Sequence, residues 1–348
     1  MVEQRNVDPD SPCIIQTAGL TKAFGVRLAV DDLDLKVMRG DIFGFLGPNG
    51  SGKTTTIRML LGLVRPTAGS IQLFGQEQSQ HLSQLLPRIG AIIETPVFYP
   101  YLSGLDNLRV VALRSGIPAG SRCDARLDEI LTLIDLSARA KDAYRKYSLG
   151  MKQRLALGAA LLTDPELILL DEPTNGLDPA GVHEMRELIR CLPQMGKTVF
   201  LSSHLLYEIQ LVCNRVAILN EGHLLYQSTV QELLQREAQI VVRMNTHTES
   251  EQTWAYLQHL SQQEASWLHD IKREQDAQGN EVFAINASSA RSSEITALLA
   301  QKHLYVAEIY QRRENLEDLF LQLTNMQGPS SSTANVRAPE DAQLGLHK

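Results

Sequence analysis

The feature that most limits how this chain can fold is the glycine-rich segment from Gly47 to Thr54. An apolar run over residues 41–46 precedes it and predicts a strand, and residues 55–61 follow it and predict a helix. A strand, a G-x-x-x-x-G-K-T loop and a helix in this order are typical of loops that bind phosphates. Glycines let backbone N–H groups turn toward an anion, and the helix start adds partial positive charge. The segment therefore predicts a nucleoside triphosphate site.

Within this loop Lys53 can reach the terminal phosphates, and the Thr54 hydroxyl can ligate a magnesium ion. An ordinary glycine-rich turn that happens to contain Lys-Thr is the alternative, and the matching strand and helix on both sides argue against it. The residues expected to bind the nucleotide here are Gly47, Pro48, Asn49, Gly50, Ser51, Gly52, Lys53, Thr54 and Thr55.

Length and composition exclude several classes of protein. At 348 residues the chain is long enough for about two domains, and its net charge of -7 argues against nucleic-acid binding. No window approaches the roughly 18 consecutive apolar residues of a membrane span, and residues 1–12 do not resemble a signal peptide. Any membrane role must then come through a partner. The 4 cysteines form no C-x-x-C pair, which favours free thiols over a zinc site.

The apolar periodicity predicts an α/β chain of two domains. Residues 14–37 predict antiparallel strands around a turn, and residues 103–162 are mostly helical, with a buried face that includes Leu127 and Ile134. After residue 238 the pattern is β-α-β-β-α-β, which suits a ferredoxin-like unit, followed by an amphipathic helix near Leu316–Leu323. We expect a flexible lead-in at residues 1–12 and a nucleotide-binding domain at 13–236. An accessory α+β domain is expected at 238–326 and a disordered tail at 327–348.

Two further segments carry chemistry. An apolar strand over residues 167–171 ends in Asp171 and Glu172, and His204 follows the next strand. Ligands of open parallel sheets bind at the carboxyl ends of the strands, so these side chains are expected beside the phosphate loop. Thr54 and Asp171 then predict a metal clamp, Glu172 a group that activates water, and His204 a contact to the terminal phosphate. A purely structural role for His204 stays open at this point.

Two other positions allow both a binding and a packing interpretation. Ser148 and Gly150 open an apolar helix, where a helix N-terminus can face an anion. Phe24 lies beside Gly25 at a predicted turn, where its ring can stack on an adenine. Spacing alone favours a core aromatic at Phe24.

Together these motifs resemble those of the nucleotide-binding subunits of ATP-binding cassette (ABC) transporters, over about residues 14–235. Residues 47–54 resemble the Walker A motif, and residues 167–171 resemble Walker B, with Glu172 in the position of the catalytic glutamate. The resemblance also implies that His204 is the switch histidine and Phe24 the adenine-stacking aromatic, which reverses the preference at both. The remaining matches are a variant signature at Ser148, Leu149, Gly150 and Met151, and a D-loop that ends at Asp178.

The resemblance implies a P-loop NTPase fold with a RecA-like parallel sheet, an antiparallel β subdomain and a helical subdomain at about residues 95–162. It also implies ATP and Mg²⁺ as cofactors, and two subunits paired head to tail. Each ATP would lie between Walker A of one subunit and the signature of the other, so that Ser148 contacts ATP held by the partner's Lys53. Hydrolysis would drive a transmembrane partner from the cytoplasmic face of the membrane.

This chain departs from the family pattern at two places. Glu94 stands where the family has a glutamine that ligates magnesium, so it is an expected metal ligand that cannot donate an amide hydrogen bond while ionised. Leu149 and Met151 replace the usual glycine and glutamine of the signature. With the aromatic loop 94–101 and the segment 316–320, these variants resemble the bacitracin- and lantibiotic-resistance branch. The loop either contacts the membrane subunit or is a rigid connector.

Three functions are therefore compared. The first is the ATPase of an exporter, extending to peptide-antibiotic or multidrug resistance. The second is a soluble ABC ATPase of translation or repair, against which stand the single cassette and the lack of a coiled-coil insertion or a basic stretch. The third is a non-hydrolysing module, which the presence of Lys53, Asp171, Glu172 and His204 disfavours. Homodimer or heterodimer, the substrate, and the role of residues 238–326 stay open.

Overall fold

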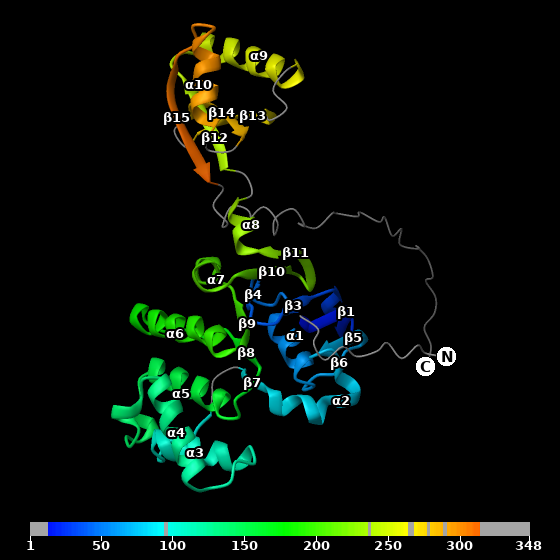
Figure 1. Ribbon diagram of the computed structural model, residues 1–348. Helices are drawn as coiled ribbons and strands as arrows, with labels where there is room; N and C mark the ends of the chain where they lie inside the picture. Colours follow the sequence, from blue (N-terminus) through cyan, green and yellow to red (C-terminus); the bar gives the residue numbers. More distant parts are fainter. Residues whose placement is uncertain are drawn as a thin grey trace, which may run out of the picture.

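The computed structural model describes residues 13–93, 97–235, 238–263, 268–276, 279–287 and 291–313. They form a central sheet, an antiparallel sheet and a helical region, followed by a smaller unit with its own sheet (Figure 1). The expected lead-in at 1–12, the amphipathic helix near 316–323 and the tail at 327–348 lie outside these residues.

The central sheet brings the carboxyl ends of several strands together. Its strands are β4 (Ile42–Leu46), β7 (Ile89–Ile92), β8 (Leu167–Asp171), β9 (Thr198–Ser203), β10 (Arg215–Asn220) and β11 (His223–Thr229). Their order is β11-β10-β4-β9-β8-β7, and every neighbouring pair is parallel except the hairpin β10–β11. β4, β8 and β9 are buried along their whole length, as continuous apolar runs in a parallel sheet require.

The antiparallel sheet packs beside the central sheet. Its strands are β1 (Cys13–Phe24), β2 (Arg27–Leu33), β3 (Lys36–Met38), β5 (Ala68–Leu73) and β6 (Gln76–Glu77). β1 pairs with β2 around a turn at Gly25, which confirms the predicted antiparallel strands. Between the two sheets the ring of Phe200 lies 5.6 Å from that of Phe43 and 5.1 Å from that of Phe45. This aromatic cluster belongs to a core shared by both sheets.

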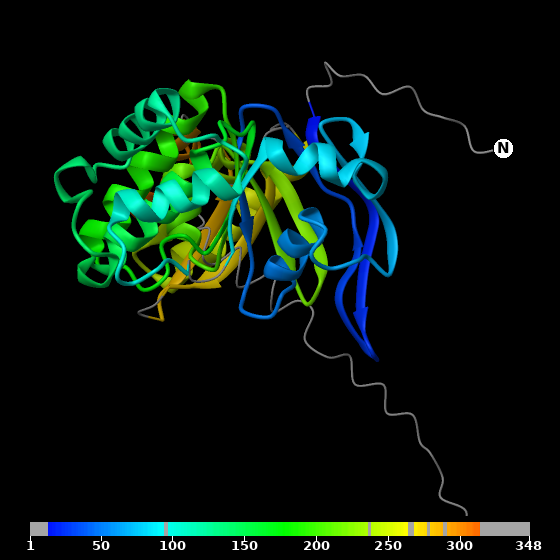
Figure 2. The same ribbon diagram turned by 90° about the horizontal axis from the view of Figure 1, so that it is seen from below.

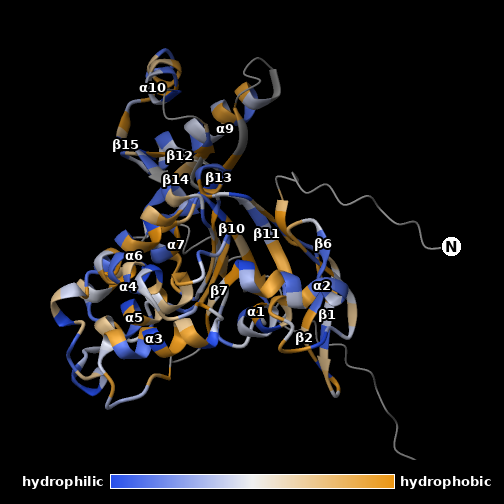
Figure 3. Cartoon of the chain, turned by 60° about the horizontal axis from the view of Figure 1, so that its bottom comes forward, coloured by the Kyte–Doolittle hydropathy of each residue, from blue (hydrophilic) through white to orange (hydrophobic). Residues whose placement is uncertain are grey.

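Helices cover the larger unit. They are α1 (Lys53–Leu60), α2 (Gln78–Leu85), α3 (Gly104–Arg114), α4 (Ser121–Leu133), α5 (Leu149–Leu161), α6 (Pro179–Cys191), α7 (Leu206–Val212) and α8 (Val230–Gln235), with 3-10 turns at Leu86–Arg88, Ser137–Arg139, Tyr144–Lys146 and Leu192–Met195. Figure 2 shows the helical region and the antiparallel sheet on opposite sides of the central sheet. Figure 3 shows both hydrophobic and hydrophilic residues along these helices. The predicted buried face of α4 is confirmed, since Leu127 and Ile130 are buried.

Helix α7 is an element for which the sequence analysis made no prediction. It has 7 residues and no side-chain cap, so local signals for it are weak. Packing accounts for it, because Ile209 of α7 lies directly against Gly44 of β4. A Cβ at Gly44 would approach Ile209 Cγ2 to 2.7 Å, so any side chain there would force α7 or its side chains to shift.

The smaller unit has the predicted β-α-β-β-α-β order. Its elements are β12 (Ala238–Met244), α9 (His247–Gln263), β13 (His269–Gln275), β14 (Glu281–Asn286), α10 (Ser292–Ala300) and β15 (Val306–Arg313). The sheet order is β13-β14-β12-β15 with all pairs antiparallel, the arrangement of a ferredoxin-like unit. Ile240, Leu257 and Phe283 belong to a separate apolar core. The predicted fold class is thus confirmed in both units.

The sequence expectations about the cysteines and about membrane-spanning segments can also be compared with the structure. All 4 cysteines are free, and burial raises the pKa of the Cys213 thiol. Among the described residues, no helix combines the length and the apolar character needed to cross a membrane.

At the edge of the central sheet where the parallel strands begin, Glu166 joins two arginines. Its Oε1 accepts a hydrogen bond from Arg88 Nε at 2.6 Å, and its Oε2 accepts one from Arg39 Nη1 at 2.6 Å. Arg88 also stacks on Phe74, with the guanidinium carbon 3.8 Å from the ring centroid. The hydrogen bonds from Arg88 and then Arg39 hold the pKa of the Glu166 carboxyl below its usual range.

Replacing Glu166 by Gln is expected to lower the free energy of unfolding at pH 7 by about 1 kcal/mol, a figure that allows for solvent screening. Because the folded-state pKa is depressed from 4.5, this stabilisation is present above that pH and is lost as the pH falls through the lowered pKa. Urea denaturation at several pH values measures it. Glu187→Gln is the control, because Glu187 makes a surface ion pair with Arg190 of its own helix. Equal losses in E166Q and E187Q would contradict the prediction.

Candidate functional site

The phosphate loop follows β4 and leads into α1, as the sequence predicted. Gly52 precedes the helix with a φ of 107°, a conformation that favours glycine. A Cβ at this position would lie 2.4 Å from the Ala29 carbonyl oxygen, so β2 also excludes a side chain here. Gly47 N–H donates to the Ser203 carbonyl at 3.2 Å, which ties the loop to the end of β9.

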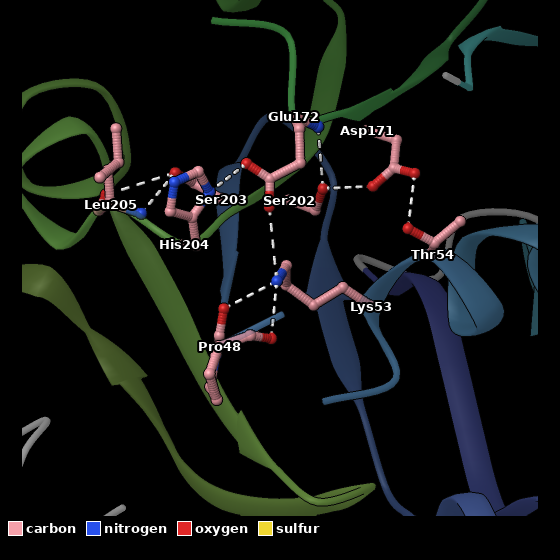
Figure 4. A network of polar contacts seen from close by, with 10 residues as sticks. Pro48, Lys53, Thr54, Asp171, Glu172, Ser202, Ser203, His204 and Leu205 are labelled. Atoms are coloured by element: carbon pink, nitrogen blue, oxygen red, sulfur yellow. Dashed lines mark hydrogen bonds and ion pairs between the residues drawn. The ribbon is translucent and has the colours of Figure 1, made fainter. Parts of the chain in front are cut away.

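Lys53 lies at the centre of the site and is only 6% exposed. Its ammonium donates to the carbonyl oxygens of Gly47 at 2.7 Å and Pro48 at 3.1 Å. It also lies 3.4 Å from Glu172 Oε1 (Figure 4). The cation is therefore held at the mouth of the phosphate loop, beside the carboxylate that follows β8.

Asp171 connects the phosphate loop to β9. Thr54 Oγ1 donates to Asp171 Oδ2 at 2.8 Å, and Ser202 Oγ donates to Asp171 Oδ1 at 2.6 Å (Figure 4). The Thr54 hydroxyl and the Asp171 carboxylate are adjacent hard oxygen donors, the ligand type that Mg²⁺ prefers. Among the described residues, no cluster of three or more His, Cys, Asp or Glu could hold a metal ion. The donor set therefore fits Mg²⁺ that also takes oxygens from nucleotide phosphates and water.

Glu172 has an unusual backbone conformation that aims its side chain into the site. Its φ is +49°, in the left-handed region, and its N–H donates to Ser202 Oγ at 2.9 Å. One carboxylate oxygen faces Lys53, and the other lies 2.8 Å from His204 Nδ1. Because a carboxylate only accepts, the Nδ1 atom carries the hydrogen in this contact. Glu172, Lys53 and His204 thus form one connected group, as predicted.

A cavity of about 430 Å³ opens beside this group. It is lined by Phe24, Arg27, Ala29, Asn49, Gly50, Gly52, Lys53, Thr54, Thr55 and Glu172. Phe24 is 53% exposed at the cavity, with Lys22 Nζ 5.0 Å from its ring centroid. The core interpretation that spacing favoured for Phe24 is therefore wrong, because the β1–β2 turn carries the ring outward to the cavity edge.

The signature and the D-loop lie at two helix starts outside this cavity. Ser148 caps α5, with its Oγ accepting from Met151 N at 3.2 Å, and Asp178 caps α6 by accepting from Gly181 N at 3.0 Å. The two starts are close, since a Cβ on Gly150 would lie 3.8 Å from Gly181 Cα. Leu149 is exposed. The residues that line the cavity include none of residues 148–151.

The structure also places residues that the sequence analysis did not single out. Ser202 is fully buried and bonds to both Asp171 and the backbone of Glu172. A signal for it exists, since it is a polar residue at the end of a buried apolar strand, two positions before His204. Glu94, the third expected metal ligand, lies outside the described residues.

A second cavity lies between β7 and the helical region. Its volume is about 600 Å³, and its lining includes Ile93, Val97, Phe98 and Arg114. Phe98 packs on Tyr144, with ring centroids 5.2 Å apart, whereas Val97 is 96% exposed. Val97 and Phe98 belong to the aromatic loop expected at 94–101, of which the structure describes residues 97–101.

Comparison with known proteins identifies relatives along most of the chain. Residues 30–175 match the family model described as ABC transporter. The chain is 39% identical over 311 residues to a bacitracin transport ATP-binding protein of Bacillus licheniformis, which covers 89% of this chain and 97% of that protein. It is 35% identical over 312 residues to a protein of the same description from Enterococcus faecalis, covering 89% of this chain and 96% of that one.

Solved structures agree with this assignment. The structure of an ATP-binding subunit of an ABC transporter has a TM-score of 0.57 and 29% identity, and covers 63% of this chain and 91% of that chain. A dimeric ATP-binding cassette with bound ADP and phosphate has a TM-score of 0.56 at 24% identity, covering 62% of this chain and 99% of that chain, and shows the shared fold. This chain belongs to the ABC transporter family of ATP-binding proteins, and it binds nucleotide and hydrolyses ATP.

Replacing Ser202 by Ala is expected to lower kcat for ATP hydrolysis about 10- to 100-fold, the usual cost of removing a group that orients a metal-binding side chain. The change removes the hydrogen bonds that fix Asp171 and the Glu172 backbone, while the phosphate loop keeps its own contacts. KM for ATP is therefore expected to change much less than kcat. Steady-state phosphate release measures both. Ser228→Ala is the control, a buried serine of edge strand β11 whose hydroxyl donates to the Thr229 carbonyl. Equal kcat values for S202A and wild type would contradict this role.

Proposed function

We propose that this ABC transporter ATPase powers an exporter whose membrane-spanning part is a separate subunit, with peptide antibiotics as the substrate class. The two bacitracin transport relatives support the substrate class over nearly the whole chain. The observation that carries the proposal is the arrangement of the site: Lys53, Thr54 and Glu172 line one cavity, whereas Ser148 to Met151 lie outside it. A second subunit is therefore needed to bring a signature to each cavity.

Within one subunit each residue has a proposed role. Lys53 and the N–H groups of the phosphate loop bind the β- and γ-phosphates, and Phe24 stacks on the adenine. Glu172 accepts the proton of the attacking water, and its contact with His204 holds that carboxylate toward the γ-phosphate. Lys53 lies 3.4 Å from Glu172, so a bound phosphate would compete with this carboxylate for the ammonium.

Thr54 and Asp171 would hold Mg²⁺, and Glu94 is proposed as a further ligand from the loop after β7. Bound there, the ion would neutralise charge on the phosphates. The chain's own part is to keep the two oxygens adjacent, which the Thr54–Asp171 and Ser202–Asp171 hydrogen bonds do. The nucleotide would thus meet a preorganised set of donors.

The second subunit would contribute Ser148, Gly150 and the backbone of Leu149 to the ATP held by the first. Two observations support this. Ser148 and Leu149 are exposed, and the lack of a Cβ on Gly150 leaves the start of α5 open to a ligand. Asp178 fixes the neighbouring D-loop by capping α6. This proposal fits a second copy of this chain and a different cassette subunit equally well.

The transmembrane partner would bind at the cavity lined by Val97 and Phe98, which places this subunit at the cytoplasmic face of the membrane. The Val97 side chain is almost fully exposed and so is available for an apolar contact with a partner. Asn107 fixes the part of the loop around Tyr99 by accepting from Tyr99 N at 2.8 Å and donating to the Ser103 carbonyl at 2.9 Å. A fixed loop can transmit force between subunits, whereas a loosely held one would absorb it.

The proposed division of the chain places the ATPase at 13–236 and an accessory domain at 238–326. The separate apolar core of the described part of the second unit supports this division. We propose that the accessory domain supports the subunit pair or regulates it, and that it does not complete the ATPase core.

Replacing Glu172 by Gln is expected to reduce phosphate release on the order of 10²- to 10⁴-fold while ATP still binds, since the amide cannot accept a proton from water. Phosphate-release assays measure hydrolysis, and equilibrium nucleotide-binding assays measure ATP binding separately. Glu129→Gln provides the control, because Glu129 pairs with Arg126 on the surface of α4. Unchanged phosphate release in E172Q would remove Glu172 from the role of base.

Replacing Val97 by Asp is expected to prevent co-purification of this subunit with a multi-span membrane protein from detergent-solubilised membranes. A carboxylate in the proposed apolar contact would be buried without a partner. Leu63→Asp is the control, since Leu63 is equally a surface apolar residue but lies outside the cavity. Nucleotide binding by each isolated variant checks its folding. A wild-type subunit that never fractionates with membranes would instead favour a soluble ABC ATPase.

A further inference from the structure

The hairpin β10–β11 reaches the nucleotide site with its turn. Asn220 pairs with His223, which leaves Glu221 and Gly222 as a two-residue turn with φ values of 48° and 88°. Positive φ at both positions is the pattern of a type I′ hairpin turn, which matches the twist of the strands. The family motifs described above do not include this turn.

Backbone hydrogen bonds join the turn to two parts of the site at once. Gly222 N–H donates to the Ser51 carbonyl of the phosphate loop at 3.1 Å. The Gly222 carbonyl accepts from Asp31 N–H of β2 at 2.9 Å. His223 adds a side-chain contact, with its Nε2 3.6 Å from Asp31 Oδ2. The turn therefore bridges the phosphate loop and the antiparallel sheet.

The close approach of the three backbones and the positive φ both favour glycine at position 222. A Cβ at Gly222 would lie 3.2 Å from the Ala29 carbonyl oxygen and 3.3 Å from Val30 Cα. Both are backbone atoms of β2, which cannot rotate away as a flexible side chain can. The same Ala29 oxygen lies 2.4 Å from the position of a Cβ on Gly52. Gly222 and Gly52 thus hold β2 between them.

The position of β2 determines where the base-binding ring lies. Phe24 ends β1 and pairs with Arg27 at the start of β2. Phe24, Arg27 and Ala29 all line the nucleotide cavity, opposite the loop residues Asn49 and Gly50. A shift of β2 at Ala29 would therefore move Phe24 relative to the phosphate loop and change the spacing between base and phosphates.

We propose that Gly222 is a positioning residue that sets the distance between the base-binding ring of Phe24 and the phosphate loop. The inference rests on the proposed stacking of the adenine on Phe24. Gly222 acts through Ala29 and is not among the residues that line the nucleotide cavity. A side chain at this position weakens recognition of the adenosine part and leaves recognition of the phosphates largely intact.

The test compares ATP with inorganic tripolyphosphate, which carries the phosphates without a base, by calorimetric titration in the presence of magnesium. Gly222→Ala is expected to raise Kd for ATP about tenfold, since base–aromatic stacking is worth roughly that factor or more. Kd for tripolyphosphate is expected to change by less than about threefold, because the loop contacts remain. An equal loss for both ligands would overturn the proposal.

Gly196→Ala is the matched control. Its φ is +75°, so alanine meets a similar backbone strain, but a Cβ there has no atom within 4 Å. If G196A weakens ATP binding as much as G222A, the effect is general strain and the proposal fails. If G222A does not fold, Gly222→Asn replaces it, because Asn tolerates left-handed backbone and its Cβ makes the same contact with Ala29.

Phe24→Ala separates this inference from the function on which it rests. If F24A leaves the preference for ATP over tripolyphosphate unchanged, the proposed base site itself is wrong. If F24A removes that preference and G222A does not, only the role of Gly222 is wrong. In the double variant, G222A is expected to add little to the effect of F24A, since both act on the same ring contact. Additive effects would show that Gly222 acts elsewhere.

Discussion

The position of β9 between β4 and β8 is the constraint on which the site depends. The phosphate loop follows β4, whereas Asp171 ends β8 and Glu172 follows it, so the strands that carry these groups are separated by a full strand. The end of β9 fills this gap with Ser202, whose hydroxyl bonds to Asp171 and to the backbone of Glu172. A buried hydroxyl with both partners in place is stable, whereas losing one partner leaves a buried polar group unsatisfied. The strand order thus places the carboxylates and also fixes them.

Local sequence signals were sufficient for most of the fold, because strands, helices and the phosphate loop each have a short-range pattern. The β-α-β-β-α-β order after residue 238 is an example, since alternating apolar runs and turn residues determine it. Ser202 shows the limit of such patterns. Its role depends on the register that pairs it with Asp171 across the sheet, and these residues are far apart in the chain. Spacing alone also placed Phe24 in the core and did not predict α7, since tertiary packing decides the environment of both.

The hairpin β10–β11 contacts the nucleotide site and leads along the chain into the second unit. Its turn contacts Ser51 and Asp31, and its second strand continues through α8 into β12. The first residue of α8 is also held in place, since Val230 N–H donates to the Asn214 carbonyl. The Asn214 side-chain amide in turn donates to the carboxylate of buried Asp41, just before β4. Both ends of β11 are therefore bonded to segments that flank the phosphate loop.

The proposed membrane contact and the signature are joined by a similar short path. Arg145 N–H donates to the Pro100 carbonyl at 3.0 Å, and Tyr144 N–H donates to the Leu102 carbonyl at 2.9 Å. The segment that makes these bonds leads directly to Ser148, the cap of α5. While these two hydrogen bonds hold, a partner that displaces the loop at 97–102 would displace the start of α5 with it. In a pair of subunits that displacement would move a signature toward or away from the neighbouring ATP. The coupling of transport to hydrolysis then requires no long-range change in the central sheet.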